Sequence, residues 1–265
     1  MSTVTIIGAG YLGSALAIAA KALQMNVIGI NKNNVNPHCH TLLMDLNSSA
    51  VNLPESEYAV CCIPPRGDYS NYHQIIENIA KRFAASNAQP RAVFVSSTGV
   101  FDQMHELIND HTRPNPQTQR GQSLLKAEQL FKEIYPPVTI IRPSRIYGPG
   151  RLGMLKNVQD NKIPTYPPQQ YSHHIAVDDL AQIILMQLTE TNDGQTLIAS
   201  DPYPQKTVDI YHWLKKPYRL TIDTNQQIVK GVKYIEPSTL IAKKFAFKHP
   251  HVFEGYINFM QNTEH

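Results

Sequence analysis

The stretch TVTIIGAGYLG at residues 3–13 decides the fold of this chain. Residues 3–7 form an apolar run rich in β-branched side chains, which predicts a strand buried on both faces of a parallel sheet. A glycine-rich segment follows at 8–13, apolar residues then recur at helical spacing as far as Leu23, and residues 27–30 predict a second strand. This order of strand, turn, helix and strand predicts a βαβ unit that binds a dinucleotide.

The glycines of this turn have separate predicted roles. Gly8 permits the tight turn, Gly10 lets the backbone approach a pyrophosphate, and Gly13 allows the helix to pack closely on the strand. The first helical residues, Tyr11 and Leu12, belong to a helix terminus whose N–H groups attract an anion. We therefore expect all five residues to contact the cofactor; a flavodoxin-like turn without a ligand is the alternative.

The end of the second predicted strand bears on the choice between NAD and NADP. An acidic residue there binds the ribose 2′-hydroxyl and repels a 2′-phosphate. This chain has Asn31, Lys32 and Asn33 instead. The missing carboxylate and the nearby cation favour NADP, with Asn31 and Lys32 as candidate contacts, although Lys32 is alternatively a solvated loop charge.

Further apolar runs extend the predicted sheet. They predict strands over 42–46, 58–63, 92–95 and 138–141, with a helix over 71–83. Strands that alternate with helices indicate an α/β protein with a Rossmann-type, doubly wound parallel sheet.

Ligands of such sheets bind at the carboxyl ends of the strands. Pro64 and Pro65 end the strand over 58–63, because proline cannot continue a central strand. We expect the residues at these strand ends to face one cleft: Ile63, Pro64, Pro65, Ser96, Ser97, Arg142 and Pro143.

Composition limits the kind of protein and its partners. The chain has 265 residues, of which 42% are hydrophobic and 17% charged, with a net charge of +3. This mix predicts a soluble globule, and the scattered charges give no reason to expect a nucleic-acid partner. No apolar run approaches the roughly 20 residues that cross a bilayer, so we expect no membrane association.

The cysteines indicate a reducing compartment, for which the cytoplasm is the default. Three cysteines are an odd number in a chain large enough to fold without disulfides. Cys61 and Cys62 lie in an apolar strand and point to opposite faces, so we expect inert buried thiols. His38, Cys39 and His40 have no second cluster at zinc spacing, and we predict no metal site.

Several segments together resemble the extended short-chain dehydrogenase/reductase family, the NAD(P)-dependent epimerases and dehydratases that mostly act on nucleotide sugars. The turn at 8–13 looks like the family's cofactor turn, and Asp45-Leu46 is similar to the pair that contacts adenine. Residues 96–101, SSTGVF, place Ser97 where the catalytic serine would fall. Residues 142–150, RPSRIYGPG, resemble the signature whose backbone lies beside the nicotinamide, which implies cofactor contacts for Pro143 and Arg145.

The resemblance breaks down at the family's catalytic tyrosine and lysine. Anchored by Gly121, Ser123 and Glu128, the tyrosine position holds Arg120 and the lysine position holds Leu124. A guanidinium cannot exchange protons near neutral pH, and leucine cannot hydrogen-bond a ribose. Ala176 also stands where the family usually has a histidine. These departures match an atypical, epimerase-like branch that lacks the tyrosine.

Other groups must then carry any chemistry. Ser97, Arg120 and Tyr147 are the candidate catalytic residues; a local turn role for the serine and a packing role for the tyrosine are the alternatives. His173 and His174 precede a predicted helix, and His174 is a candidate substrate contact.

Arginines supply a candidate anion pocket. Arg142 and Arg151 are further substrate candidates, and with Arg120 and Arg145 they could bind a carboxylate or a phosphate bidentately. Salt bridges to scattered acidic residues are the alternative.

The chain divides into a predicted NAD(P)-binding Rossmann domain over 1–150 and a small α/β capping lobe over 151–265 that partly returns to it. Two functions remain open. The first is an NADP-dependent or NAD-dependent epimerase-like oxidoreductase with a rebuilt proton-transfer site, acting on a small, anionic substrate such as a nucleotide sugar. The second is a non-catalytic NADP-binding sensor. A homodimer is compatible with either.

Overall fold

The computed structural model of the chain describes residues 1–48, 52–65, 69–102, 106–190, 194–216 and 231–261. These residues form two compact units. Unit 1 comprises Met1–Asp102, Pro114–Arg142 and Leu180–Leu197, and unit 2 comprises Gln103–Arg113, Pro143–Asp179 and Ile198–His265. Both units are therefore assembled from several separate segments of the chain.

A seven-stranded sheet is the largest sheet in the described part of the chain. Its strands lie in the order β11-β7-β5-β4-β1-β2-β3, and the neighbours from β7 to β3 pair in parallel. The register places Ile7 opposite Ile30 on one side and Cys61 on the other. The strands span β1 Thr3–Ile7, β2 Asn26–Asn31, β3 His40–Leu43, β4 Tyr58–Cys61, β5 Arg91–Val95, β7 Thr139–Pro143 and β11 Thr196–Ala199.

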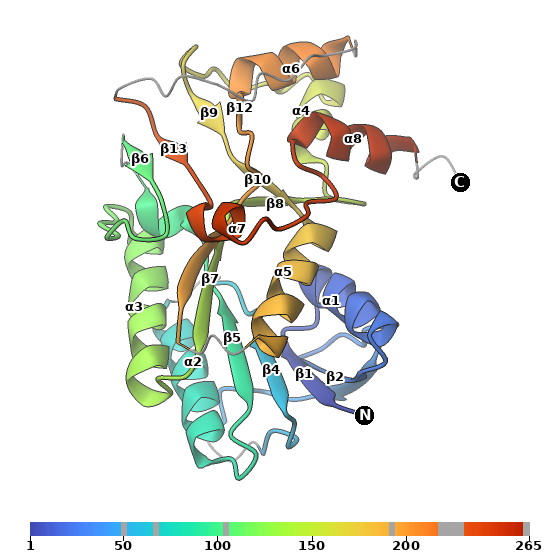
Figure 1. The fold of residues 1–265 in the computed structure, drawn as a ribbon, viewed down its shortest axis with the longest axis vertical. Helices are drawn as coiled ribbons and strands as arrows, with labels where there is room; N and C mark the ends of the chain where they lie inside the picture. Colours follow the sequence, from blue (N-terminus) through green and yellow to red (C-terminus); the bar gives the residue numbers. More distant parts are fainter. Residues whose placement is uncertain (49–51, 66–68, 103–105, 191–193, 217–230, 262–265) are drawn as a thin grey trace. The chain divides into compact units, whose positions relative to one another are not determined.

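Helices cover both faces of this sheet. In Figure 1, α2 (Tyr69–Ala85) and α3 (Gln119–Ile134) lie on one face, and α1 (Tyr11–Ala22) and α5 (Val177–Thr189) lie on the other. Under α2 and α3, Phe131 stacks on Phe94 and contacts Phe83, with ring centroids 5.4 and 5.9 Å apart. The predicted α/β class and doubly wound parallel sheet are confirmed.

Unit 2 contains short paired strands and small helices. Three two-stranded sheets join segments far apart in sequence: β8 (Arg145–Tyr147) with β10 (His174–Ala176), β9 (Tyr171–Ser172) with β12 (Gln205–Lys206), and β6 (Leu107–Ile108) with β13 (Tyr234–Ile235). The helices are α4 (Gly153–Gln159), α6 (Thr207–Lys215), α7 (Ser238–Ala242) and α8 (Val252–Gln261).

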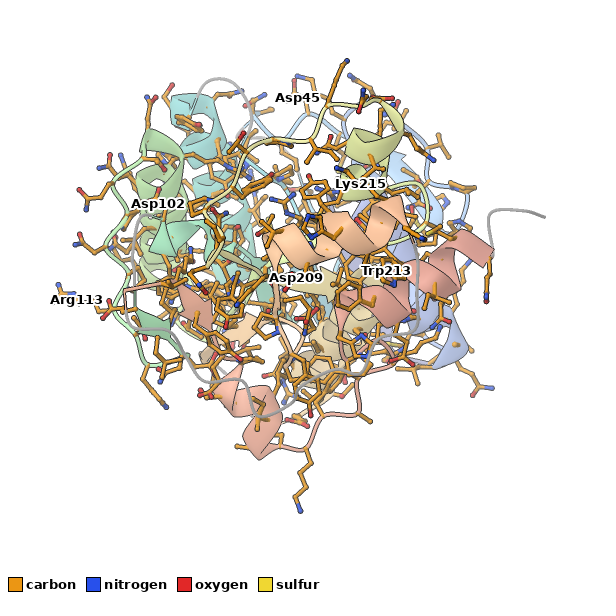
Figure 2. All side chains as sticks on the ribbon, turned by 90° about the horizontal axis from the view of Figure 1, so that it is seen from above. Asp45, Asp102, Arg113, Asp209, Trp213 and Lys215 are labelled. Atoms are coloured by element: carbon orange, nitrogen blue, oxygen red, sulfur yellow. The ribbon has the colours of Figure 1, made fainter. Side chains whose placement is uncertain are left out.

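An aromatic core holds unit 2 together. Trp213 lies on α6 (Figure 2). Its ring packs edge-on against the Phe253 ring, with the ring centroids 5.1 Å apart. Tyr147 stacks on Tyr256 at 5.5 Å, and a Cβ at Gly255 would stand only 2.0 Å from the Tyr147 hydroxyl. Only glycine at position 255 therefore leaves room for this tyrosine.

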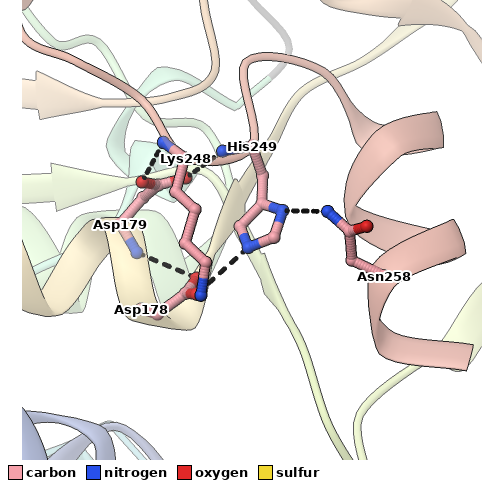
Figure 3. A network of polar contacts seen from close by, with 5 residues as sticks. All are labelled: Asp178, Asp179, Lys248, His249 and Asn258. Carbon is pink, nitrogen blue, oxygen red and sulfur yellow. Dashed lines mark hydrogen bonds and ion pairs between the residues drawn. The ribbon is translucent and has the colours of Figure 1, made fainter. Parts of the chain in front are cut away.

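A polar network joins the start of α5 to the segment before α8 (Figure 3). The Asp179 carboxylate accepts hydrogen bonds from the backbone N–H groups of Lys248 and His249 at 2.8 and 2.9 Å. Asp178 pairs with the Lys248 ammonium and His249 Nε2, each at 3.0 Å. Burial alone would raise the pKa of Asp178, but the bonds from His249 and Lys248 lower it to about 2.

Several strand boundaries differ from the sequence-based prediction, among them those of β3 and β4. The third strand runs over His40–Leu43 rather than 42–46, and β4 stops at Cys61 rather than at residue 63. Both predictions followed apolar runs, whereas pairing ends these strands: β3 can pair only along the end of β2, and β4 ends where β1 turns away. In the described ranges, no helix has both the length and the apolar character that crossing a membrane requires.

Candidate cofactor site and catalytic centre

The turn between β1 and α1 requires glycine at two positions. Gly8 has φ 85°, and a Cβ there would lie 3.1 Å from the carbonyl carbon of Cys62. A Cβ at Gly13 would lie 3.1 Å from the Gly8 oxygen and 3.2 Å from Ile6 Cγ2. The first glycine thus fits a left-handed turn against the end of β4, and the second lets α1 pack closely on β1.

Gly10 differs, because the space where its Cβ would stand is open, with no heavy atom within 4 Å. No side chain caps the start of α1, and its first turn contains no acidic residue. An uncapped helix start behind a glycine turn suits an anion. The residues present therefore fit the pyrophosphate of a dinucleotide.

The end of β2 holds the residues predicted to choose between NAD and NADP. The Asn31 amide donates to the Ala9 carbonyl at 3.2 Å and to the Asn34 carbonyl at 2.8 Å. Lys32 is exposed and pairs with Asp45 at 3.0 Å. A hydrogen bond from the Asn47 backbone and the pairing with Lys32 lower the pKa of Asp45. Lys32, the predicted contact of a 2′-phosphate, and Asp45, the predicted contact of the adenine, thus form an ion pair with each other.

The loop after β2 contains a functional candidate that the sequence prediction missed. Asn36 is 3% exposed, and its amide donates to the Ala9 carbonyl at 2.8 Å and to Ser14 Oγ at 3.0 Å. In an asparagine-rich loop it reads as one more solvated residue. The sequence shows only that Asn36 lies in a polar segment, and this gives no signal of burial.

Unit 1 also brings together residues at the carboxyl ends of β5 and β7. The Ser96 hydroxyl donates to Glu128 Oε1 at 2.5 Å. Arg142 binds the same carboxylate through Nε at 3.1 Å and Nη2 at 2.7 Å, and its guanidinium lies 5.1 Å from the centroid of the Phe101 ring. Arg142 is only 6% exposed, and its guanidinium is paired with the Glu128 carboxylate. This argues against its predicted role in an anion pocket.

The segment around Ser97 and the start of α3 form the predicted catalytic centre. Ser97 Oγ accepts a hydrogen bond from the Gly99 N–H at 3.1 Å, the local turn bond named above as the alternative. Arg120 is exposed in the first turn of α3, and Leu124 is buried. A Cβ at Gly99 would stand 3.3 Å from Leu124 Cδ1, so the leucine packs beneath the serine-containing turn.

Five further predicted site residues belong to unit 2. Tyr147 is 2% exposed, its hydroxyl has no hydrogen-bond partner among the described residues, and burial raises its pKa far above the ordinary value. His174 is fully buried, and burial followed by the charge of Arg145 lowers its pKa to about 3. Pro143 is buried, whereas Arg145 and Arg151 are exposed. Tyr147 and His174 thus occupy core positions, which weakens their candidacy for substrate contact.

The cysteines and possible metal ligands add no further centre. Cys61 is fully buried, and burial raises its thiol pKa to about 12. Within the described ranges, no three histidine, cysteine, aspartate or glutamate side chains gather as a metal site would require.

The geometry described above agrees with comparisons to known proteins. The model of the NAD dependent epimerase/dehydratase family matches residues 4–199. A solved structure of a candidate NAD-dependent epimerase/dehydratase from Methylobacillus flagellatus superposes with a TM-score of 0.80 at 25% identity, covering 100% of this chain and 99% of that one. A candidate epimerase from Burkholderia cenocepacia gives 0.80 at 17% identity, covering 96% and 95%.

A third structure, the Bordetella bronchiseptica enzyme WbmG in complex with NAD and UDP, gives a TM-score of 0.75 at 13% identity and covers 98% of this chain and 95% of its own. No curated protein sequence matches the chain. The fold and the glycine turn define a dinucleotide-binding protein of the Rossmann class. More particularly, the chain belongs to the NAD-dependent epimerase/dehydratase family, whose cofactor is a nicotinamide dinucleotide.

Proposed function

We propose that this protein binds NADP in preference to NAD and acts as an epimerase-like or dehydratase-like oxidoreductase on a small anionic substrate such as a nucleotide sugar. The observation that carries the proposal is the uncapped start of α1 behind Gly8, with open space at Gly10. In the family context, that space is where the backbone and a pyrophosphate would meet.

The cofactor-binding residues follow from their positions in unit 1. The turn at 8–13 would hold the pyrophosphate, Asp45 and Leu46 the adenine, and Lys32 a 2′-phosphate. Ile63, Pro64, Pro65 and Ser96 follow or end strands β4 and β5, whose carboxyl ends lie on the ligand side of such a sheet. The cofactor contacts of Pro143 and Arg145, and the substrate contacts of Arg151 and His174, are proposals for variants to test.

A bound nicotinamide would accept or donate a hydride; the protein must orient the substrate and handle its proton. Ser97 Oγ accepts a hydrogen bond from Gly99 through one lone pair, which leaves its O–H able to rotate and donate to a substrate oxygen. Arg120 cannot exchange protons near neutral pH but can bind an anionic group bidentately. We therefore assign orientation of the substrate to Ser97 and Arg120, and leave Tyr147 as the acid/base candidate that Tyr147→Phe would test.

Positions 120 and 124 favour a second function. When the sequence is anchored on Gly121, Ser123 and Glu128, Arg120 and Leu124 would stand where the family carries its proton-transferring tyrosine and its lysine. A chain that keeps the cofactor turn while losing this pair suits a non-catalytic NADP-binding sensor. Such a protein would bind the cofactor tightly and turn over no substrate.

One titration separates these functions. Purified protein is titrated with NADPH and NADH by fluorescence, and a panel of nucleotide sugars and small carbonyl compounds is then added while absorbance of the reduced cofactor is followed. We expect binding of NADPH, with Gly10→Ala weakening it about tenfold or more because a Cβ fills the open space. Binding without turnover on the whole panel favours the sensor, and no binding at millimolar cofactor contradicts both functions.

A further inference from the structure

Asn36 holds the glycine turn by a set of hydrogen bonds that uses all of its polar groups. Its amide donates to the Ala9 carbonyl at 2.8 Å and to Ser14 Oγ at 3.0 Å, and its Oδ1 accepts the His38 N–H at 2.8 Å. Its backbone N–H donates to Thr41 Oγ1 at 3.0 Å. A buried amide satisfied on every side has a single orientation, because any rotation would leave a polar atom unpaired.

These bonds act on two successive carbonyl groups of the turn. The Ala9 carbonyl accepts from both Asn36 and Asn31, at 2.8 and 3.2 Å. Ser14 Oγ, which receives the second Asn36 bond, donates in turn to the Gly10 carbonyl at 2.9 Å, and the Ser14 N–H donates to the same oxygen at 2.8 Å. Asn36 is thus connected to the peptide groups on both sides of Gly10.

Fixing a carbonyl also fixes the N–H on the other side of the peptide bond. The peptide group is planar and trans, so its C=O and N–H point in opposite directions. Since the Gly10 carbonyl points along α1 toward Ser14, the N–H of residue 11 points out of the helix start. This is the direction from which an anion would approach an uncapped helix.

We propose that Asn36 is a positioning residue for the cofactor: through Ala9 and Ser14 it sets the peptide planes around Gly10 that receive the pyrophosphate. The inference rests on the proposed cofactor binding and adds a residue outside the glycine turn to it. The segment that carries Lys32 is then bonded to the turn that carries Gly10, since Asn31 and Asn36 both donate to the Ala9 carbonyl.

The test compares ligands with and without a pyrophosphate. Wild-type protein, Asn36→Leu and Ser14→Ala are titrated with ADP-ribose by calorimetry and with adenosine by ligand-observed NMR. We expect Asn36→Leu to weaken ADP-ribose binding about tenfold and to leave adenosine binding within about twofold, because the proposed adenine contacts, Asp45 and Leu46, lie outside the turn at 8–13 that Asn36 bonds. Ser14→Ala, a mild change on a half-exposed helical position, should weaken ADP-ribose by about threefold.

The double variant and a matched control separate positioning from loss of stability. Because Asn36 acts partly through Ser14, the double variant should lose less ADP-ribose affinity than the two single losses combined. Tyr135→Phe removes another buried side-chain bond of unit 1, from the tyrosine hydroxyl to the Pro90 carbonyl at 2.8 Å, and should leave ADP-ribose binding unchanged. The proposal is overturned if Asn36→Leu and Ser14→Ala leave ADP-ribose affinity intact, if adenosine affinity falls equally, or if Tyr135→Phe has the same effect. Absence of ADP-ribose binding by the wild type would overturn the proposed cofactor function together with it.

Discussion

Under the proposed preference for NADP, the ion pair between Lys32 and Asp45 would make cofactor choice depend on a charge outside the glycine turn. Lys32 pairs with Asp45 at 3.0 Å, so a 2′-phosphate must compete with this carboxylate for the ammonium. We expect Asp45→Asn to raise NADPH affinity by about threefold while NADH affinity stays constant or falls, since the freed lysine attracts the phosphate. Fluorescence titration with both cofactors gives the ratio.

Lys32→Gln provides the control for this prediction. It should remove the NADPH advantage in either background, and high salt should reduce the effect of Asp45→Asn because both charges are exposed. An unchanged NADPH to NADH ratio in Asp45→Asn would show that Lys32 does not select the cofactor.

The buried pair of Glu128 and Arg142 stabilises the strand ends around Ser96. Their side chains are 5% and 8% exposed, so removing one partner leaves a charge buried without a counterion. We expect Glu128→Gln or Arg142→Met to lower the free energy of unfolding by about 3–5 kcal/mol, and the double variant to lose less than the two changes summed. Urea unfolding of the four proteins measures the coupling; additive losses would mean that the pair is energetically neutral.

At the residue scale, the sequence predicts well wherever backbone geometry alone dictates the residue type. Gly8 and Gly13 have the close contacts expected of their places in the turn. Burial of polar side chains is not visible in the same way. Asn36, Arg142 and His174 read as surface residues, and each is buried because partners distant in sequence satisfy or surround it.

At the scale of elements, the segment after β11 contains an acid whose charge conflicts with its surroundings. Asp201 is 1% exposed, and burial, reinforced by Asp179, raises its pKa well above the ordinary value. The folded protein therefore retains a proton that the unfolded chain releases above about pH 4. Asp201 therefore lowers the free energy of unfolding as pH rises above that value, until the carboxyl of the folded protein ionises.

Asp201→Asn removes this penalty without changing the size of the side chain. We expect the variant to unfold at higher urea concentration than wild type at pH 7, with a smaller advantage at pH 4, where the unfolded aspartate is itself largely protonated. The exposed Asp209→Asn, in the first turn of α6, serves as the control and should leave the pH dependence unchanged. An Asp201→Asn variant that is less stable than wild type at pH 7 would show that the ionised carboxylate is required.

Long apolar elements were predictable, and short pairings were not. β1 matches its predicted limits, and β5 differs from its predicted limits by one residue at one end. The two-residue strands β6, β9, β12 and β13 escaped prediction because a pair that short carries no periodic signal. Their formation depends on partners such as Leu107 and Tyr234, which lie far apart in the chain.

For the whole molecule, the sequence predicted the order of the large sheet's elements but not how the chain is shared between two units. Residues 180–197 belong to unit 1 although they begin thirty positions after the signature at residues 142–150. The assignment of cofactor binding to one unit and substrate capping to the other is a proposal, since the two units alternate along the chain.

A fragment ending at residue 150 tests how far unit 1 depends on its last segment. That fragment lacks α5 and also β11, the neighbour of β7 at the end of the sheet. We expect it to show a broad, weakly cooperative urea transition and to expose an unpaired edge that promotes aggregation. A fragment ending at residue 199 should recover cooperativity in part; a sharp transition for 1–150 at the wild-type midpoint would contradict this dependence.

The alternation of segments also imposes an order of events during synthesis. The cofactor turn leaves the ribosome first, yet the strand that flanks β7 ends at residue 199. At typical rates of translation, β7 would wait several seconds for this neighbour, roughly 3 to 11 s after its own residues are made. During that interval the nascent chain presents an open strand edge, so chaperones that bind exposed strands should meet this protein on the ribosome rather than after its release.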